Sequence, residues 1–279
     1  MKNRVKARLP LLFIFYVLMA GIGILTYPML SDWISVYTAK IEIADYTAAL
    51  EKEDTSEIEA MLKKAQDYNK ALSEGDEESV ASYDELLAVT DAIGYLEIPK
   101  INVYMPIYHG IDTEVLERGI GHMPDTSLPV GGISTHCVLS GHTGLPAAKI
   151  LTDLDQMKEG DLFYIHVLNE TLAYKVDQIK VVLPEETDDI RIVPGKDYVT
   201  LLTCTPYGVN SHRLLVRGER TEYVPEEMPL SADGSGVTEK AKLPVRTILM
   251  MAGGGAAGVV LVMTLLILFV PFGRKKKKV

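Results

Sequence analysis

Two long runs that lack any charged residue constrain the fold of this chain more than any other feature. They span residues 9–30 and 247–272. Each is long enough to cross the roughly 30 Å hydrocarbon core of a bilayer as a helix that rises about 1.5 Å per residue. A buried helix of a soluble protein of that length would normally carry a polar stripe, and neither run does. We therefore predict two transmembrane helices with one folded region between them.

Basic residues at both ends of the chain set the expected orientation. Residues 1–8 and 273–279 hold nine of the 28 Lys and Arg residues and none of the 38 Asp and Glu residues, so the chain between these tails carries a formal charge of −19. Positive residues beside a membrane span tend to stay in the cytoplasm. We expect both tails inside the cell and the region between the spans outside it. The first span is expected to be a retained anchor, because no small-x-small cleavage site follows it.

The negative charge of the middle region argues against one class of function. Binding to nucleic acid needs a basic surface against the phosphates, so no nucleic-acid partner is expected. The run of lysines at 275–278 is instead expected to lie against anionic membrane lipid.

The character of the sequence changes at Gly94. Residues 31–93 are polar and helix-favouring, with apolar residues at three- and four-residue steps and expected breaks near 54–56 and at Gly75. Beyond Gly94, short segments rich in Ile, Val, Leu and Tyr are separated by Gly, Pro, Asn and Asp, which indicates strands. The expected strands are 95–98, 103–108, 137–140, 162–167, 172–182, 198–203 and 214–217.

The spacing of these strands predicts a closed β-barrel with short helices. The fold is therefore expected to be mainly β, with a helical region ahead of the barrel and a transmembrane helix on each side. The predicted parts are a basic tail (1–8), a transmembrane helix (9–30), an extracellular helical region (31–93), the barrel (94–220), a linker (221–246), a second transmembrane helix (247–272) and a second basic tail (273–279).

Three residues of the barrel region could form a catalytic site together. Cys204 ends one expected strand and Arg213 begins the next, with turn-favouring Pro, Gly and Asn residues between them. If these strands are antiparallel neighbours, the two side chains face each other, and the cation would stabilise a thiolate or an oxyanion. His142 lies between two glycines after another strand, and histidine is a suitable acid, base or charged neighbour for a thiol. Each residue alone also suits a structural role, as a buried cysteine or a solvated histidine.

Several motifs around these residues resemble those of the sortases, and most of all the pilus-assembling class C. They are GYLEIPKI (94–101), DTSLPVGG (125–132), SGHTGL (140–145), TLLTC (200–204), TPYG (205–208) and HRLLVRG (212–218). The resemblance covers residues 94–220 and implies a sortase-like barrel. Two membrane spans also suit class C.

The resemblance implies a membrane-anchored cysteine transpeptidase with His142, Cys204 and Arg213 as its catalytic residues. Cys204 would attack the Thr carbonyl of a Leu-Pro-X-Thr-Gly-like (LPXTG-like) sorting signal on a surface or pilin protein and form a thioacyl intermediate. An amine, expected to be a pilin lysine, would then take the acyl group. The further candidates for substrate contact are Thr203, Thr205, Tyr207 and His212.

Several alternatives stay open at this point. Class C sortases usually carry an Asp-Pro-aromatic plug ahead of the barrel, and the region between Leu72 and Gly94 has none, so either no lid exists or another segment covers the cleft. Cys137 is expected to be a buried small hydrophobe, with a disulfide to Cys204 as the alternative.

No cofactor and no metal is expected, because His122 and His136 do not show the ligand spacing of a zinc site with Cys204. The competing functions are a cell-wall anchoring sortase, a cysteine hydrolase that uses the same residues, and a membrane-tethered binding module without catalysis. Product formation that depends on an amine would separate transfer from hydrolysis.

Overall fold

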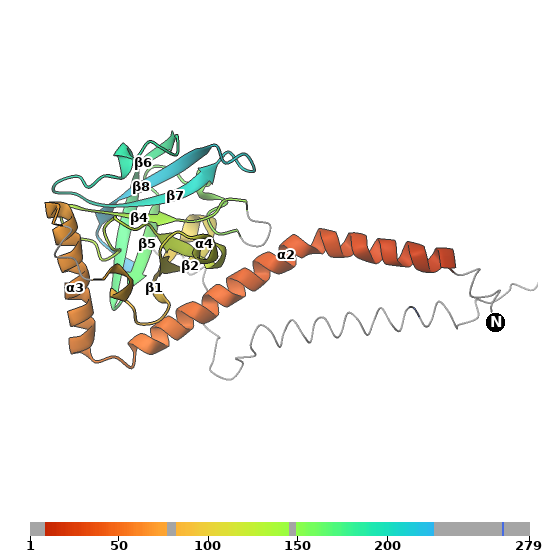
Figure 1. The fold of residues 1–279 in the computed structure, drawn as a ribbon, viewed down its shortest axis with the longest axis horizontal. Helices are drawn as coiled ribbons and strands as arrows, with labels where there is room; N and C mark the ends of the chain where they lie inside the picture. The colour runs from red at the N-terminus through yellow and green to blue at the C-terminus, as the bar shows by residue number, and fades with distance from the viewer. Residues whose placement is uncertain (1–8, 77–81, 145–148, 226–263, 265–279) are drawn as a thin grey trace, which may run out of the picture. The chain divides into compact units, whose positions relative to one another are not determined.

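The computed structural model describes residues 9–76, 82–144, 149–225 and 264 (Figure 1). The chain divides into two compact units, Met1–Leu30 with Gly234–Val279, and Ser31–Asp233. Helix α2 (Leu9–Leu50) begins in the first unit and ends in the second.

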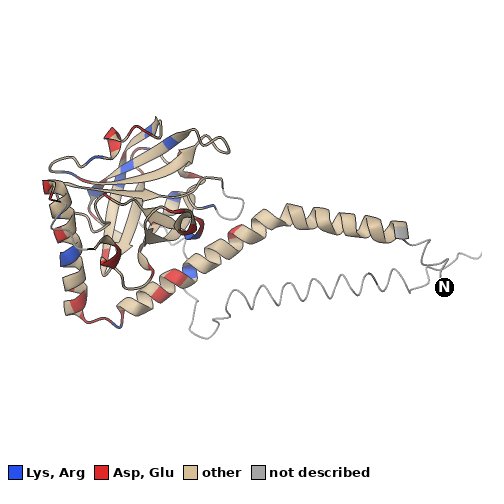
Figure 2. Ribbon diagram, in the orientation of Figure 1, with Lys and Arg blue, Asp and Glu red and all other residues tan. Residues whose placement is uncertain are grey.

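The N-terminal part of α2 has the composition of a membrane span. The helical segment Pro10–Leu50 is long enough and apolar enough to cross a membrane, with a mean hydropathy of 2.0 in its most apolar stretch. Figure 2 shows no Lys, Arg, Asp or Glu on α2 before Asp32. The second predicted span lies outside the described residues except for Thr264, whose Oγ1 is 2.9 Å from Tyr16 Oη. The described part of the chain thus holds one candidate span.

The second unit is built on a closed barrel of strands (Figure 1). Around the barrel the order is β1-β2-β3-β4-β7-β8-β6-β5. The strands are β1 (Ala92–Ile98), β2 (Val103–His109), β3 (Ile120–His122), β4 (Thr135–Ser140), β5 (Leu162–Val167), β6 (Glu170–Val182), β7 (Asp197–Thr205) and β8 (His212–Thr221). The β2–β3 and β4–β7 pairs are parallel, and the other pairs are antiparallel. The predicted closed β-barrel is confirmed.

Short helices precede or connect the strands. They are α4 (Thr113–Arg118) and the 3₁₀ turns η2 (Tyr83–Glu85), η3 (Pro99–Ile101), η4 (Leu154–Gln156) and η5 (Asp188–Ile190). Inside the barrel, alternate residues of each strand form the core, as the two-residue period of a strand requires. On β4 and β7 these residues are Cys137, Leu139, Val199 and Leu201, each no more than 2% exposed.

Two helices pack against the outside of the barrel. The last turns of α2 bury Ala39, Ile43, Tyr46 and Leu50, which recur at three- and four-residue steps. After a break, α3 (Thr55–Glu74) runs beside the barrel and ends at Gly75, whose left-handed backbone (φ 74°) suits glycine. The buried Asn69 side chain accepts a hydrogen bond from the Leu128 amide at 2.7 Å and donates one to the Leu128 carbonyl at 3.1 Å. The expected breaks near 54–56 and at Gly75 are therefore present.

The segment just before β1 is fastened to the barrel through His109 and His122, which are register partners on β2 and β3. His109 Nε2 donates to the Leu86 carbonyl at 2.7 Å. His122 Nε2 donates to the Ser127 carbonyl at 2.9 Å, which leaves its Nδ1 as an acceptor. The Tyr83 hydroxyl lies 2.7 Å from that Nδ1, so the neutral His122 ring accepts a hydrogen bond from Tyr83.

This buried contact predicts a loss of stability in mild acid. Burial lowers the pKa of His122 from 6.5 to about 4, and burial also lowers the pKa of His109. The unfolded chain therefore takes up more protons than the folded chain as the pH falls below 6.5. We expect the contribution of His122 to the free energy of unfolding to be complete above about pH 6.5. By pH 5 the loss of this contribution is expected to lower the free energy of unfolding by about 2 kcal/mol. Urea unfolding followed by circular dichroism at pH 7 and pH 5 measures this loss.

The matched variant for that measurement is His122→Gln, which is neutral at both pH values. It is expected to be less stable than the wild type at pH 7 and to lose less stability between pH 7 and pH 5. Equal pH dependence in the variant and the wild type would contradict the assignment to His122.

Candidate active site

Cys204 and Arg213 lie opposite each other on neighbouring strands. Cys204 is near the end of β7 and Arg213 near the start of β8, and the two residues are register partners in the antiparallel β7–β8 pair. The Cys204 thiol is free and partly exposed. The hairpin arrangement predicted from the sequence is therefore present.

His142 reaches the same place from a distant part of the chain. It comes two residues after β4, and β4 runs parallel to β7, so the carboxyl ends of both strands lie at one edge of the barrel. The ladder continues past the last strand residue, where the Gly141 amide donates to the Leu202 carbonyl at 3.0 Å. His142, Cys204 and Arg213 all line one cleft of about 350 Å³.

The walls of this cleft are mainly apolar and come from several elements. One set of lining residues is Ile111, Leu116 and Met123, and another is Val182, Leu183, Pro184, Glu186, Thr187 and Ile190. The second set belongs to the end of β6 and to the connection between β6 and β7, residues 183–196. A ligand with apolar side chains suits such a cleft, because the walls exclude water while the few polar lining groups can orient it.

Thr203 connects the strand of Cys204 to the loop of His142. Its buried hydroxyl donates to the Gly141 carbonyl at 2.6 Å and accepts a hydrogen bond from the Thr143 hydroxyl. These two partners lie immediately before and after His142. Thr203 also lines the cleft, as a residue in contact with substrate must.

The other three candidates for substrate contact do not line the cleft. Thr205 and His212 are the next register pair beyond Cys204 and Arg213. Tyr207 is 67% exposed on the β7–β8 loop and lies against Gly144, where an added Cβ would come within 3.0 Å of its ring. These residues surround the mouth of the site, so a bound peptide reaches them only if it extends beyond the cleft.

The local electrostatics favour an anion beside Arg213. Its Nη1 donates to the carbonyls of Asn210 at 3.2 Å and His212 at 3.1 Å, which fixes the guanidinium at the start of β8. Within the described ranges, no carboxylate lies within ion-pair distance of Arg213. Its charge is therefore available to a thiolate or to an oxyanion in the cleft.

The second cysteine is separate from this site. Cys137 points into the barrel core from β4, is 2% exposed and is not bonded to Cys204. Burial raises the pKa of the Cys137 thiol, so it stays protonated. Of the two alternatives for Cys137, the structure supports the buried hydrophobe and contradicts the disulfide. Among the described residues, no group of three His, Cys, Asp or Glu side chains is placed to hold a metal ion.

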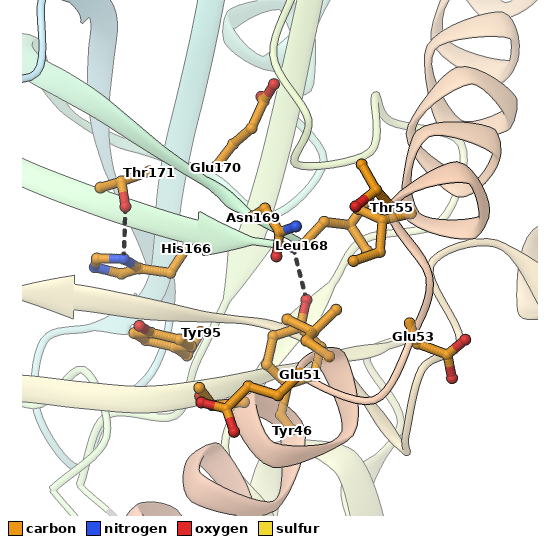
Figure 3. A pocket seen from close by; sticks show the side chains of 13 residues that line it. Tyr46, Glu51, Glu53, Thr55, Tyr95, His166, Leu168, Asn169, Glu170 and Thr171 are labelled. Carbon is orange, nitrogen blue, oxygen red and sulfur yellow. Dashed lines mark hydrogen bonds between the residues drawn. The ribbon is translucent and has the colours of Figure 1, made fainter.

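Figure 3 shows a second cavity, of about 390 Å³, whose lining does not include Cys204. It is lined by the end of α2, the start of α3 and the β5–β6 turn. In Figure 3 the Tyr46 hydroxyl accepts a hydrogen bond from the Leu168 amide at 2.8 Å, and Thr171 bonds to His166. Thr171 is at the start of β6, whereas Val182, at the end of β6, pairs with Arg213. The two cavities are thus at opposite ends of the barrel, and this one cannot present a ligand to Cys204.

A thiol, an imidazole and a guanidinium at one apolar cleft of a β-barrel are typical of enzymes that transfer acyl groups through a cysteine. The model of the sortase domain family matches residues 96–221. The chain is 31% identical to sortase D of Bacillus subtilis (strain 168) over 132 residues, and 36% identical to sortase A of Staphylococcus aureus (strain NCTC 8325 / PS 47) over 118 residues. These alignments cover 46% and 41% of this chain and 64% and 55% of those relatives.

Solved structures give a longer match. The structure of Streptococcus agalactiae sortase C1 in complex with MTSET is 48% identical with a TM-score of 0.61, and the match covers 64% of this chain and 97% of that one. Clostridium perfringens sortase C, solved with a C-terminal cell wall sorting motif, is also 48% identical with a TM-score of 0.60, over 65% of this chain and 98% of that one. The chain belongs to the sortase family, and these neighbours are class C sortases.

Proposed function

We propose that this chain is a membrane-anchored class C sortase, a cysteine transpeptidase that joins an LPXTG-like sorting signal to an amine. The observation that carries the proposal is the pairing of Cys204 with Arg213 beside His142 in the cleft of a sortase barrel. In this proposal Cys204 is the nucleophile, Arg213 stabilises the oxyanion and His142 transfers protons.

The first half of the reaction forms a thioacyl enzyme. The Cys204 thiolate attacks the Thr carbonyl carbon, a C–S bond forms, and the carbonyl oxygen becomes an oxyanion next to the Arg213 guanidinium. When this intermediate collapses, the Thr–Gly C–N bond breaks and protonated His142 donates its proton to the leaving glycine amine. The acyl group of the sorting signal then remains on Cys204 as a thioester.

The second half transfers the acyl group to an amine. The nitrogen of the attacking amine bonds to the thioester carbon, and His142, now neutral, accepts the proton that the amine loses. The C–S bond then breaks and the Cys204 thiolate is released. The class C neighbours include a Streptococcus pneumoniae sortase C whose structure bears on pilin substrate specificity, and they support pilus polymerisation as the outcome. The amine in this proposal is a pilin lysine. The apolar walls around Cys204 support transfer over hydrolysis, because they limit the access of water.

Both apolar runs are proposed to span the membrane, with the barrel outside the cell and membrane lipid around the spans. The length and composition of α2 and the hydrogen bond between Tyr16 and Thr264 support this topology. Protease added to intact cells is expected to cleave residues 221–246 and to leave both basic tails intact. Cleavage at the tails of intact cells would contradict it.

The cleft is proposed to lack the lid that is usual in class C. Among the described residues, none before Ile111 lines it. Tyr83, in the region between Leu72 and Gly94 that lacks the plug motif, bonds to His122 on the barrel. A wild-type enzyme without a lid is expected to react with a sorting peptide without a lag or an activating step.

The test of the proposed function is a mass measurement on the full chain in detergent. The enzyme is mixed with an LPXTG peptide, and intact mass spectrometry follows the gain of the acyl fragment. An adduct that an added amine converts to a new amide would establish the transpeptidase. An adduct released only by water would support the hydrolase, and a folded protein that forms no adduct with any sorting peptide would support the binding module.

A further inference from the structure

One wall of the cleft is a connection that must be held in place from outside the cleft. Residues 183–196 join β6 to β7, and five of them line the cleft beside Cys204: Leu183, Pro184, Glu186, Thr187 and Ile190. Most of this connection is exposed, and its only helical element is the three-residue turn η5 (Asp188–Ile190). Such a short turn has little stability of its own, so contacts with the barrel must position it.

The barrel holds the residues on both sides of Ile190. Before it, Asp189 forms an ion pair with Lys180 of β6. After it, the Arg191 carbonyl accepts a hydrogen bond of 2.8 Å from Nδ1 of His136, on β4. The residue between these two anchors, Ile190, lines the cleft. The two contacts therefore fix the position at which the wall meets a bound peptide.

His136 is itself held so that it can make this contact. Because Nδ1 donates to a carbonyl, Nε2 of the neutral ring is an acceptor. It accepts a hydrogen bond from the hydroxyl of Thr200, on β7, whose Oγ1 is 2.7 Å away. His136 is 1% exposed and Thr200 is fully buried. Burial lowers the pKa of His136, and the neighbouring Arg217 cation lowers it further, so the ring is neutral near pH 7. A neutral ring with both nitrogens bonded has one orientation.

We infer that His136 is a positioning residue for substrate recognition. Through its hydrogen bond to the Arg191 carbonyl, His136 holds the cleft wall at Ile190 in place, and the position of this wall sets the affinity of the cleft for the acyl-donor peptide. This inference rests on the proposed function, since it concerns the peptide that Cys204 attacks. His136 touches neither the thiol nor the substrate. Its loss is therefore expected to change binding and to leave the chemical step nearly unaltered.

Two substitutions at His136 separate its two hydrogen bonds. In His136→Asn the side-chain amide nitrogen takes the place of Nδ1 and keeps the donor to Arg191. In His136→Gln the polar end takes the place of Nε2, faces Thr200 and loses the bond to Arg191. For His136→Gln, we expect the KM for an LPXTG peptide to rise about three- to ten-fold, with kcat within about two-fold, as the loss of one hydrogen bond implies. His136→Asn is expected to stay within about two-fold of the wild type in both constants.

Two further measurements separate this role from a general effect on folding. The rate at which iodoacetamide alkylates Cys204 is expected to be unchanged in His136→Gln. Hydrogen exchange of the backbone amides of residues 186–193 is expected to become faster in that variant only. The matched control is His166→Gln, which changes another largely buried histidine with two side-chain partners, Glu97 and Thr171, at the other end of the barrel.

The exchange measurement also keeps this inference distinct from the proposed function. If the wild type forms no thioacyl adduct, the proposed function fails, and hydrogen exchange still tests the contact between His136 and the wall. An unchanged KM together with unchanged exchange in residues 186–193 of His136→Gln would overturn the inference. Equal effects of His136→Gln and His136→Asn would overturn it as well, since only one of them lacks the bond to Arg191.

Discussion

Replacing Cys204 with alanine is expected to abolish both the thioacyl adduct and the transfer of the peptide to an amine. Without the sulfur atom no covalent intermediate can form, and the fall in rate is expected to be on the order of 10⁴-fold or more, as for other catalytic nucleophiles. Cys204 is partly exposed at the end of β7, so its removal leaves the core unaltered. Intact mass and product formation on the same sample measure the two losses.

The matched control is the other cysteine. Cys137→Ala removes a thiol that is enclosed in the barrel core, whose pKa burial raises. It is expected to cost about 1 kcal/mol of stability through a small cavity, and to leave the adduct on Cys204 intact. An adduct that persists in Cys204→Ala and disappears in Cys137→Ala would reverse the assignment of the nucleophile.

Replacing Arg213 with lysine is expected to lower the rate of thioacyl formation by about 10²- to 10³-fold, the range found when a donor to an oxyanion is removed. The charge remains, but lysine lacks the planar fork that can bond two backbone carbonyls and still face an oxyanion. Arg213 uses Nη1 for the carbonyls of Asn210 and His212, which leaves its other donors for the cleft. Stopped-flow mixing with a fluorescent sorting peptide measures the first turnover.

The control for this substitution is Arg220→Lys, near the far end of the same strand. Arg220 lies over the ring of Tyr174, with its guanidinium carbon 5.5 Å from the ring centre, and lines no part of the cleft. Its variant is expected to match the wild type within about two-fold, since surface charge contacts contribute little. Equal rates for Arg213→Lys and the wild type would show that charge alone, and not the geometry of the guanidinium, is needed.

The strands could be read from the sequence where their pattern is local. All seven predicted strands are present, because each is a short run rich in Ile, Val, Leu or Tyr that turn-favouring residues set apart from its neighbours. The strand that was missed, β3, has only three residues with a glycine in the middle. Gly121 is required there, since an added Cβ would lie 2.4 Å from the Gly110 carbonyl oxygen. Such a tertiary requirement leaves no periodic signal.

The part of the site that depends on local sequence could also be predicted, and the rest could not. Cys204 and Arg213 are joined by one hairpin, so their pairing follows from the turn residues between them. Thr203 was predicted as a substrate contact from its motif, whereas the structure also places its hydroxyl between the two neighbours of His142. For His136 the sequence suggests only a zinc ligand, a role that its spacing does not support. Its role depends on the parallel pairing of β4 with β7, which joins residues about sixty positions apart and which no local pattern reveals.

The order of the strands also determines when Cys204 and Arg213 can meet during synthesis. Of the strands that the structure describes, β8 is the last to leave the ribosome, yet it inserts between β7 and β6, which both keep an unpaired edge until it arrives. Before that insertion Cys204 has no guanidinium beside it, because Arg213 is on β8. A nascent chain thus holds Cys204 without its register partner, and the Cys204–Arg213 pair forms only when the barrel has closed.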